Sequence, residues 1–423
     1  MVVNAIGMGL AYLMHVLFAK WLGLGQYGYY VYTLAWLNVL TILVQLGMNT
    51  STVRITAELR AQGNHAAIMG LSIFSTRVVV VLGIGLIAVG VIFLPLIVGL
   101  IERELALTLA VMLPLVVVLS LLYQRMALLQ GFGRVLQAQT FLEILRPLVL
   151  IGLVGLFVRL FQVEAHWAMG ANLIATTIAL IAATAVTCRY LAVEGVGLRD
   201  RVFETRAWLA VSLPYLVIGA LTVVMNQSDV LMLGTLMGGA AAGLYAPAAK
   251  LAQLALFPML AMRSRAAPLM AKLYAENNVH ELQRQMNNTT IISALAGILL
   301  VGGLVWQRET LLGAFGPDFV EGVPILVVLA LTMAVFAVTG GVEVFLIFGP
   351  FERITMFIYI FVVVLNITLN LIWIPTHGAL GAAYATAVTV IARALISTFV
   401  VWRRTNILPL ARLVQSTNRS VWG

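Results

Sequence analysis

The chain reads HWAMGA at residues 166–171 and HGALGA at residues 377–382, and each hexapeptide begins a long apolar segment. Two further pairs of related segments recur in the same order: GYY at 28–30 with GLY at 243–245, and QGFGR at 130–134 with FGPFER at 348–353. The members of each pair lie 211 to 218 residues apart, about half the chain. Duplicated membrane halves are the architecture of many transporters. The repeats therefore predict a duplicated membrane protein.

The composition excludes a soluble domain. Hydrophobic residues make up 62% of the chain, charged residues make up 10%, and the mean hydropathy is +1.04. Soluble domains carry about 25% charged residues, so the chain belongs to the membrane class. The single cysteine, Cys188, can form neither an internal disulfide nor a cysteine cluster for a metal.

Apolar segments long enough to cross a membrane recur along the whole chain. A transmembrane helix needs about 20 mostly apolar residues, whereas barrel strands alternate in polarity over about ten residues. The sequence predicts an all-α integral membrane protein with twelve transmembrane helices, at about residues 2–19, 29–53, 71–99, 105–129, 139–160, 167–188, 209–235, 244–270, 288–306, 323–348, 355–374 and 380–402.

Six spans fall in each half of the chain. The predicted parts are an N-lobe at 1–195, a cytoplasmic linker at 196–208, a C-lobe at 209–402 and a cytoplasmic tail at 403–423. Because six is even, both halves enter the membrane from the same side, and the two six-helix repeats are parallel.

The basic residues predict the orientation, because cytoplasmic loops are rich in Lys and Arg. Of the 25 basic residues, four fall on the predicted outer side and three within spans, which leaves 18 on the cytoplasmic side. The outer four are Lys20, Arg103, Arg159 and Arg308. Both termini are therefore predicted to be cytoplasmic. The net charge of +9 follows from this topology and indicates no nucleic-acid partner.

Several motifs together resemble one family. They are LGLGQYG at 22–28, DVLMLG at 229–234, GLYAPAAK at 243–250, FGPDF at 315–319, Asn366 with Asn370, and GALGAA at 378–383 after Pro375. This pattern is similar to that of polysaccharide-repeat flippases of the Wzx type, within the multidrug/oligosaccharidyl-lipid/polysaccharide superfamily. The similarity covers essentially the whole chain.

The resemblance implies both an architecture and an activity. The fold would be two six-helix lobes around a central cavity, in the plasma (inner) membrane. The substrate would be a polyprenyl-diphosphate-linked oligosaccharide, such as an O-antigen unit for lipopolysaccharide, moved from the cytoplasmic to the outer leaflet by alternating access. Glycosyltransferases or a polymerase of the same pathway are the partners it implies, together with membrane lipids.

Two charged residues flank the turn at Gly238-Gly239. Asp229 and Lys250 each lie about ten residues from its centre, so two antiparallel helices would bring them to the same depth. One interpretation is a structural salt bridge between spans seven and eight. The other is a protonatable acid that faces a cavity and changes partners during transport, since charges at midspan cost about 2.5–3.5 kcal/mol and need a reason.

A group of cations near the predicted cytoplasmic mouth suits a diphosphate, because a guanidinium group binds phosphate oxygens in a bidentate manner. The candidate substrate-binding residues are Arg54, Arg265, Lys250, Arg77 and Arg263. The alternative is that these side chains extend to the lipid headgroups and bind no substrate.

Four further charges are expected to pair within the membrane. Arg393 lies near the middle of the last span and is expected to face an acid, with Glu343 as the candidate. Glu143 and Arg146 are three residues apart on one helical face and are expected to pair with each other. Asp229 or Glu343 would carry a coupling proton or sodium ion.

The sequence contains no sign of an enzyme or a cofactor. The five histidines, His15, His65, His166, His280 and His377, are scattered without metal-ligand spacing. No phosphate-binding glycine loop with lysine appears, so ATP is not the direct driver. An inside-negative potential would instead favour outward movement of an anion.

Three rival functions remain open. The first is a cation-coupled multidrug antiporter of the same superfamily, which is expected to have acids in its N-lobe cavity and few arginines at the mouth. The second is a lipid-linked peptidoglycan-precursor flippase, which typically has fourteen spans. The third is a membrane glycosyltransferase or polymerase, which is expected to have a large outer loop, whereas the outer loops predicted here are short.

Overall fold

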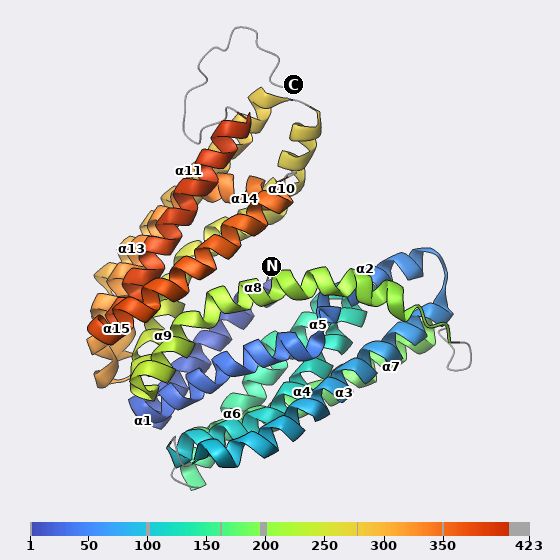
Figure 1. Cartoon of the computed structure of the whole chain (residues 1–423), viewed down its shortest axis with the longest axis horizontal. Helices are drawn as coiled ribbons and strands as arrows, with labels where there is room; N and C mark the ends of the chain where they lie inside the picture. The colour runs from blue at the N-terminus through green and yellow to red at the C-terminus, as the bar shows by residue number, and fades with distance from the viewer. Residues whose placement is uncertain are drawn as a thin grey trace. The chain divides into compact units, whose positions relative to one another are not determined.

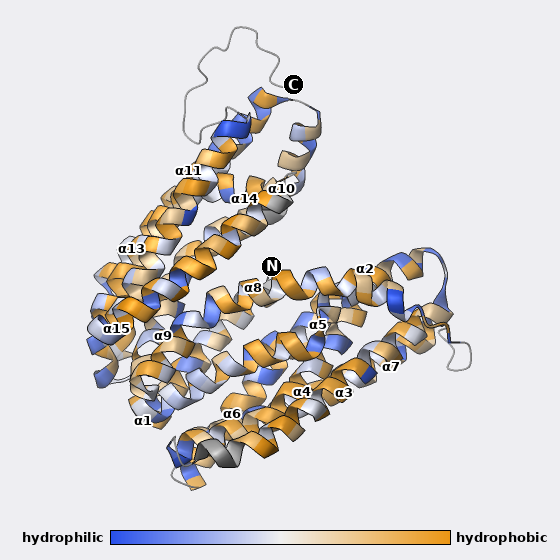
Figure 2. Cartoon of the chain, viewed as in Figure 1, coloured by the Kyte–Doolittle hydropathy of each residue, from blue (hydrophilic) through white to orange (hydrophobic). Residues whose placement is uncertain are grey.

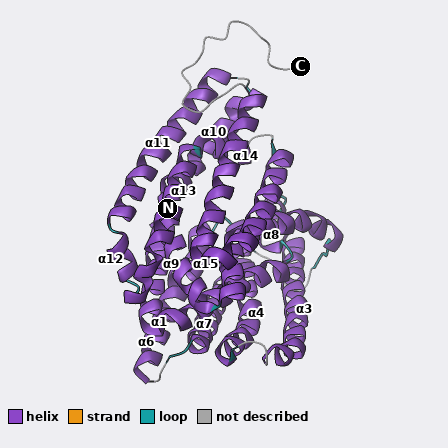
Figure 3. Cartoon of the chain, turned by 60° about the vertical axis from the view of Figure 1, so that its left-hand side comes forward, coloured by secondary structure: helices purple, strands orange, loops and turns teal. Residues whose placement is uncertain are grey.

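The computed structural model describes residues 2–98, 102–160, 163–194, 201–276, 278–348 and 351–405, and every regular element in these ranges is a helix (Figures 1 and 3). Ten helical segments are long and apolar enough to cross a membrane. Two of them contain a glycine with non-helical dihedral angles, Gly23 and Gly378. Each break lies between two predicted spans, and the ten segments are therefore consistent with the predicted twelve spans. The all-helical membrane fold is confirmed.

The chain divides into two compact units. The first comprises Met1–Gly234 with Gly238–Gly243, and the second Thr235–Met237 with Leu244–Gly423. This division falls after the linker predicted at 196–208, of which residues 196–200 lie outside the described ranges. The helix that follows the linker packs on the first unit: the Ser212 and Ser51 hydroxyls are 2.6 Å apart, and the Trp208 and Phe74 ring centroids are 5.7 Å apart.

In its described residues, the first unit contains eight α-helices and one π-helix, the last three residues of α8 belonging to the second unit. They are α1 (Val2–Gln45), α2 (Met48–Ala61), α3 (His65–Val98), α4 (Arg103–Gly131), α5 (Val135–Thr140), the π-helix η1 (Phe141–Leu145), α6 (Arg146–Leu160), α7 (Ala165–Val193) and α8 (Thr205–Met237). Helices α4 and α7 share the most extensive contact of any helix pair in the described structure. The side chains of Phe18, Tyr27 and Tyr30 on α1 are fully buried.

The second unit contains several short helical pieces and also α15, the longest helix of the described structure. They are α9 (Gly239–Gln253, which begins in the first unit), the 3₁₀ turn η2 (Leu254–Leu256), α10 (Phe257–Ala275), α11 (Val279–Trp306), α12 (Arg308–Gly313), the 3₁₀ turn η3 (Pro317–Gly322), α13 (Val323–Val338), α14 (Gly340–Phe348) and α15 (Glu352–Thr405). Because proline lacks an N–H and crowds the preceding turn, Pro258 coincides with the interruption between α9 and α10.

Hydrophobic residues recur along nearly the whole length of these helices (Figure 2). Large residues such as Val81, Ile181 and Leu299 are 67%, 65% and 76% exposed. A helix that is apolar on all sides suits a lipid environment, whereas soluble monomers rarely expose large contiguous apolar patches. The exposed surface therefore agrees with the predicted membrane location.

The second predicted span is shorter than expected. It was predicted at 29–53, but α1 ends at Gln45 and α2 begins at Met48. Leu46 and Gly47 both have positive φ angles, 50° and 73°, and this conformation ends a right-handed helix. Arg54 consequently lies on α2, a short polar helix, and not at the end of a transmembrane helix.

Candidate functional site

A cavity with both polar and apolar walls lies inside the first unit. Its volume is about 230 Å³, and residues from α1, α4, η1, α6 and α7 line it. Apolar residues such as Leu34 and Leu150 form part of the wall. The polar and titratable groups in the lining are His15, Tyr30, Asn38, Tyr123, Glu143, Arg146 and Asn172. Such a concentration of polar groups within a membrane-spanning bundle marks a functional candidate.

The π-helix η1 places Glu143 in the cavity wall. Within it, the backbone N–H of Arg146 donates to the carbonyl of Phe141, five residues earlier. Pro147 lacks an N–H, and its ring would crowd the carbonyl of residue 143 in a regular α-helix. The wider π turn relieves this conflict, and such turns are frequent at functional sites.

Arg146 bonds to α7 and not to its neighbour on the chain. Its Nη2 is 2.9 Å and its Nε 3.2 Å from Asn172 Oδ1, and Nε is 3.1 Å from Thr176 Oγ1. Among the ion pairs of the described residues, none joins Glu143 to Arg146. The expected direct pair is therefore wrong, because the π turn changes the helical spacing on which it depended.

Two contacts with α1 complete the surroundings of the cavity. His15 Nδ1 lies 3.1 Å from the Tyr27 hydroxyl. Gly7 faces Glu143 so closely that a Cβ on Gly7 would lie 2.7 Å from the glutamate Cβ and from its Oε2. Only glycine leaves room for the Glu143 side chain at this point of α1.

The predicted diphosphate-binding cations occupy separate surroundings. Arg54 is exposed and its Nε lies 2.7 Å from Glu58 Oε1 on α2. Hydrogen bonds to Glu58 and Tyr215 raise its pKa, so it stays charged. The Arg77 guanidinium lies 6.0 Å from the centroid of the Phe203 ring.

The other three cations belong to the second unit. Lys250 is exposed on α9, and Arg263 and Arg265 lie on α10 with side chains outside the described part of the structure. Asp229 is buried on α8 in the first unit. Because these residues divide between two units, both the cation cluster and the Asp229–Lys250 pair stay predictions.

A buried ion pair joins α14 to α15. Arg393 Nη2 is 2.6 Å from Glu343 Oε2 and 2.9 Å from the Tyr359 hydroxyl, so the expected partner of Arg393 is present. The Arg393 guanidinium also lies 4.9 Å from the Phe336 ring centroid and 4.6 Å from that of Tyr359. Glu343 is 1% exposed. A role for either residue in ion coupling stays a prediction.

Comparison with known proteins shows which family and which solved structures this chain resembles. The family described as polysaccharide biosynthesis protein matches residues 1–274, more than half of the chain. The chain belongs to this family. An inward-facing multidrug resistance MATE family transporter of the MOP superfamily superposes with a TM-score of 0.78, at 15% identity over 94% of each chain. The lipid II flippase MurJ superposes with a TM-score of 0.73, at 13% identity over 95% of this chain and 86% of its own.

Two further proteins resemble this chain. A MOP superfamily transporter from Pyrococcus furiosus, described as having a binding pocket of reverse polarity, gives a TM-score of 0.66 at 16% identity over 96% of this chain and 94% of its own. An uncharacterised membrane protein, MJ1375, from Methanocaldococcus jannaschii is 26% identical over 175 residues. That match spans 41% of each chain, well under half the relative's length. The resemblance to MOP superfamily transporters is thus confirmed, and the solved structures that resemble this chain are transporters or flippases and not enzymes.

The sequence did not reveal the cavity of this polysaccharide biosynthesis protein. Its lining comes from positions as far apart as His15 and Asn172, and no local pattern connects them. One signal was available: Glu143, Arg146 and Pro147 stand together inside an apolar span. If this segment is assumed to be a regular α-helix, Glu143 and Arg146 are expected to pair with each other, and no cavity is predicted.

Proposed function

We propose that the protein moves a polyprenyl-diphosphate-linked oligosaccharide from the cytoplasmic to the outer leaflet of the plasma membrane. The observation that carries this proposal is the match to a polysaccharide biosynthesis family on a chain with a MOP transporter fold. MurJ, which shares the fold, is described as a flippase of lipid II, and this favours a lipid-linked substrate over a free solute.

The volume of the cavity suits a small ion and not the proposed substrate. Pockets for drug-sized ligands measure about 300–1,000 Å³, and this one is about 230 Å³. An oligosaccharide does not fit in it, whereas a proton or a sodium ion with several water molecules does, since each water takes about 30 Å³. The cavity therefore serves coupling, with Glu143 as the acid that binds the ion.

Glu143 is better placed for this role than the other two candidate acids. Glu343 is held by Arg393 at 2.6 Å, and an acid in a buried ion pair cannot take up a cation without leaving arginine uncompensated. Asp229 is 9% exposed on α8, and it remains the second candidate. The proposed carrier thus lies in the first unit, on the π-helix.

The substrate head is proposed to bind to cations. Arg54 and Arg265, with Lys250, Arg77 and Arg263, supply the guanidinium and ammonium groups that bind a diphosphate. An inside-negative membrane potential favours outward movement of such an anion by about 2.3 kcal/mol per charge per 100 mV. Ion movement through the Glu143 cavity adds to this driving force.

Depletion of the protein in its native host tests the proposal. Surface polysaccharide should fall while lipid-linked oligosaccharide accumulates inside the cell, because the export step is lost. The accumulated lipid would also give the glycan for mass analysis. Unchanged glycans together with new sensitivity to cationic drugs would refute the flippase proposal and favour the multidrug antiporter. The antiporter is the second candidate because the chain also resembles a MATE transporter in fold.

The Glu143→Gln variant tests the coupling site. Complementation with this variant should restore less than a tenth of wild-type surface polysaccharide, because glutamine has no carboxylate to take up a proton or to balance the charge of a bound sodium ion, while membrane levels of the protein stay normal. Glu281→Gln is the matched control, since Glu281 sits in the first turn of α11 and pairs only with Arg284 among the ion pairs of the described residues. Full export by Glu143→Gln would remove Glu143 from the coupling role.

A further inference from the structure

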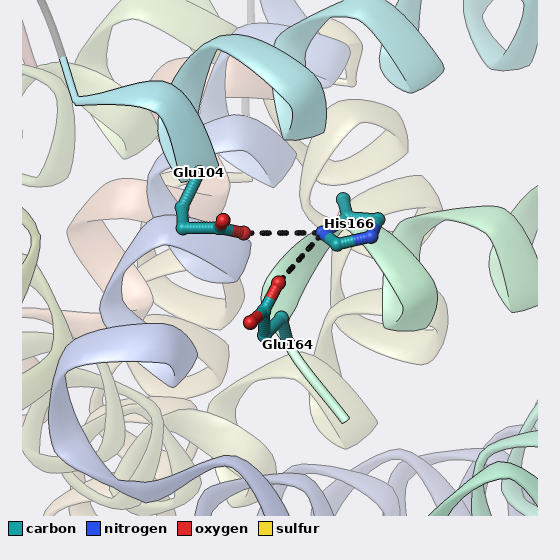
Figure 4. A group of neighbouring side chains, drawn as sticks. All are labelled: Glu104, Glu164 and His166. Atoms are coloured by element: carbon teal, nitrogen blue, oxygen red, sulfur yellow. Dashed lines mark hydrogen bonds and ion pairs between the residues drawn. The ribbon is translucent and has the colours of Figure 1, made fainter. Parts of the chain in front are cut away.

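Three metal-ligating side chains converge where α4 and α7 begin (Figure 4). His166 Nδ1 is 3.2 Å from Glu104 Oε2 and 3.3 Å from Glu164 Oε2. Glu104 lies in the first turn of α4, Glu164 directly precedes α7, and His166 is the second residue of α7. In the described part of the chain, this is the one group of three or more His, Cys, Asp or Glu residues whose ligand atoms all lie within 4.8 Å of one another.

Helix capping does not explain the convergence. A carboxylate near a helix N-terminus interacts favourably with the helix dipole, which accounts for Glu104 and Glu164 one at a time. It does not account for two carboxylates that approach the same imidazole nitrogen. A single Nδ1–H can donate one good hydrogen bond, and Glu164 also lies within hydrogen-bonding reach of Glu104 and near the charge of Arg103, so two carboxylates crowd together around one imidazole nitrogen.

The distances match those of a bound transition metal. Zinc bonds to nitrogen and oxygen at about 2.0–2.2 Å in a tetrahedral arrangement, and neighbouring ligands of such a tetrahedron are therefore about 3.3–3.5 Å apart. The two measured separations, 3.2 and 3.3 Å, are close to this spacing. One imidazole with two carboxylates suits Zn²⁺ or a similar first-row ion, whereas Mg²⁺ and Ca²⁺ prefer oxygen ligands alone.

An ion from the surroundings can reach the three ligands. The side chains of His166, Glu104 and Glu164 are 20%, 28% and 42% exposed. The distribution of basic residues predicts that this end of the helices faces outward. Arg103, predicted on the same side, and Glu102, which accepts a hydrogen bond from Tyr29, are the nearest other charged residues along the chain.

We propose that Glu104, Glu164 and His166 form a binding site for a divalent transition-metal ion of the Zn²⁺ class, with water in the fourth position. Since α4 and α7 share the most extensive helix contact of the described structure, the ion adds a link between two helices that are already packed together. The proposed role of the site is therefore structural: the bound ion stabilises the predicted outer end of the first unit. It is independent of the transport proposal.

The internal repeat supplies a control for the test. His166 opens the hexapeptide HWAMGA, and His377 opens its counterpart HGALGA. His377 Nδ1 lies 2.7 Å from the Thr376 hydroxyl and its ring centroid lies 6.3 Å from that of Tyr384. It belongs to no ligand cluster in the described ranges.

Thermal unfolding of the full-length protein in detergent, stripped of metal with a chelator, tests the proposal. Added Zn²⁺ should raise the unfolding midpoint by about 3 °C, with one ion bound per chain by mass spectrometry of metal content. The shift should vanish in His166→Ala and Glu104→Gln and persist in His377→Ala. Mg²⁺ and Ca²⁺ at the same concentration should give no shift.

Two results would overturn the site. One is a Zn²⁺ shift in His166→Ala equal to that of the wild-type protein. The other covers the case in which the variants fail to fold: Co²⁺ added to the wild-type protein should give the visible absorption bands of a tetrahedral site, and their absence would exclude it. Export by a folded His166→Ala variant should remain at the wild-type level, because the site is outside the cavity.

Discussion

A single side chain, Arg393, shows how the membrane interior constrains a charge. From the middle of the predicted last span, in the C-terminal half of α15, it is not expected to reach a lipid headgroup. The fold supplies Glu343 and the Tyr359 hydroxyl at 2.6 and 2.9 Å with two aromatic rings over the guanidinium. The pair is nevertheless incompletely bonded, since Glu343 Oε1 and Arg393 Nε are buried without a hydrogen-bond partner. It holds α14 to α15 but is not an ideal stabilising contact.

Removal of one partner should therefore cost far more than removal of both. Arg393→Met leaves Glu343 as an uncompensated buried charge and should destabilise the protein by about 3–5 kcal/mol. The double variant Arg393→Met with Glu343→Met should unfold near the wild-type temperature, because two buried charges are replaced by apolar groups. Thermal unfolding of the purified proteins measures this, and equal losses in the single and double variants would contradict it.

At the scale of elements, the packing of α1 against the start of α9 depends on glycine. A Cβ on Gly28 would overlap the carbonyl oxygen of Gly239, and a Cβ on Gly243 would lie 3.0 Å from the Cα of Gly28. Gly28 and Gly243 are the two glycines that the internal repeat aligns. Small residues let membrane helices approach to backbone contact.

Gly28→Ala should lower stability by about 1–3 kcal/mol, because an added methyl group in a packed site forces the backbones apart. The same substitution at Gly25, three residues earlier on α1, meets no atom within 4 Å and should be neutral or slightly stabilising. The amount of folded protein extracted from membranes and its unfolding temperature separate the two variants. Matching behaviour would show that the close approach is unimportant.

At the scale of the whole molecule, the distribution of basic residues predicts an orientation in the membrane with both termini in the cytoplasm. Cys188, near the predicted cytoplasmic end of α7, is exposed and is the only cysteine of the chain. Chemical labelling of this cysteine can therefore test the orientation without the introduction of another cysteine. Trp306, 81% exposed at the end of α11, is predicted to face the opposite side.

A maleimide that does not cross membranes should react with Cys188 in inside-out vesicles and not in intact spheroplasts. In a Cys188→Ser background, Trp306→Cys should react in spheroplasts. Labelling detected on gels measures both. Reaction of Cys188 in intact spheroplasts would show that the orientation is opposite to the predicted one. The Glu104–Glu164–His166 cluster would then lie on the cytoplasmic side.

The sequence by itself determined the fold class, because runs of about 20 apolar residues admit only one solution in lipid, a helix with all its backbone groups bonded internally. It also indicated the family through motifs that stand close together, and it anticipated the Arg393–Glu343 contact because a charge at that depth requires a partner. Each of these inferences rests on a local pattern or on depth in the membrane alone.

Tertiary structure decided whatever depended on residues brought together from different helices. It placed Arg146 against Asn172, 26 residues away, and it brought Glu104 to His166 across 62 positions. It also changed local geometry: the π turn before Pro147 separated Glu143 from Arg146, and the positive φ angles at Leu46 and Gly47 moved Arg54 onto a helix of its own. Sequence spacing assumes a regular helix, so it fails wherever packing or proline breaks that regularity.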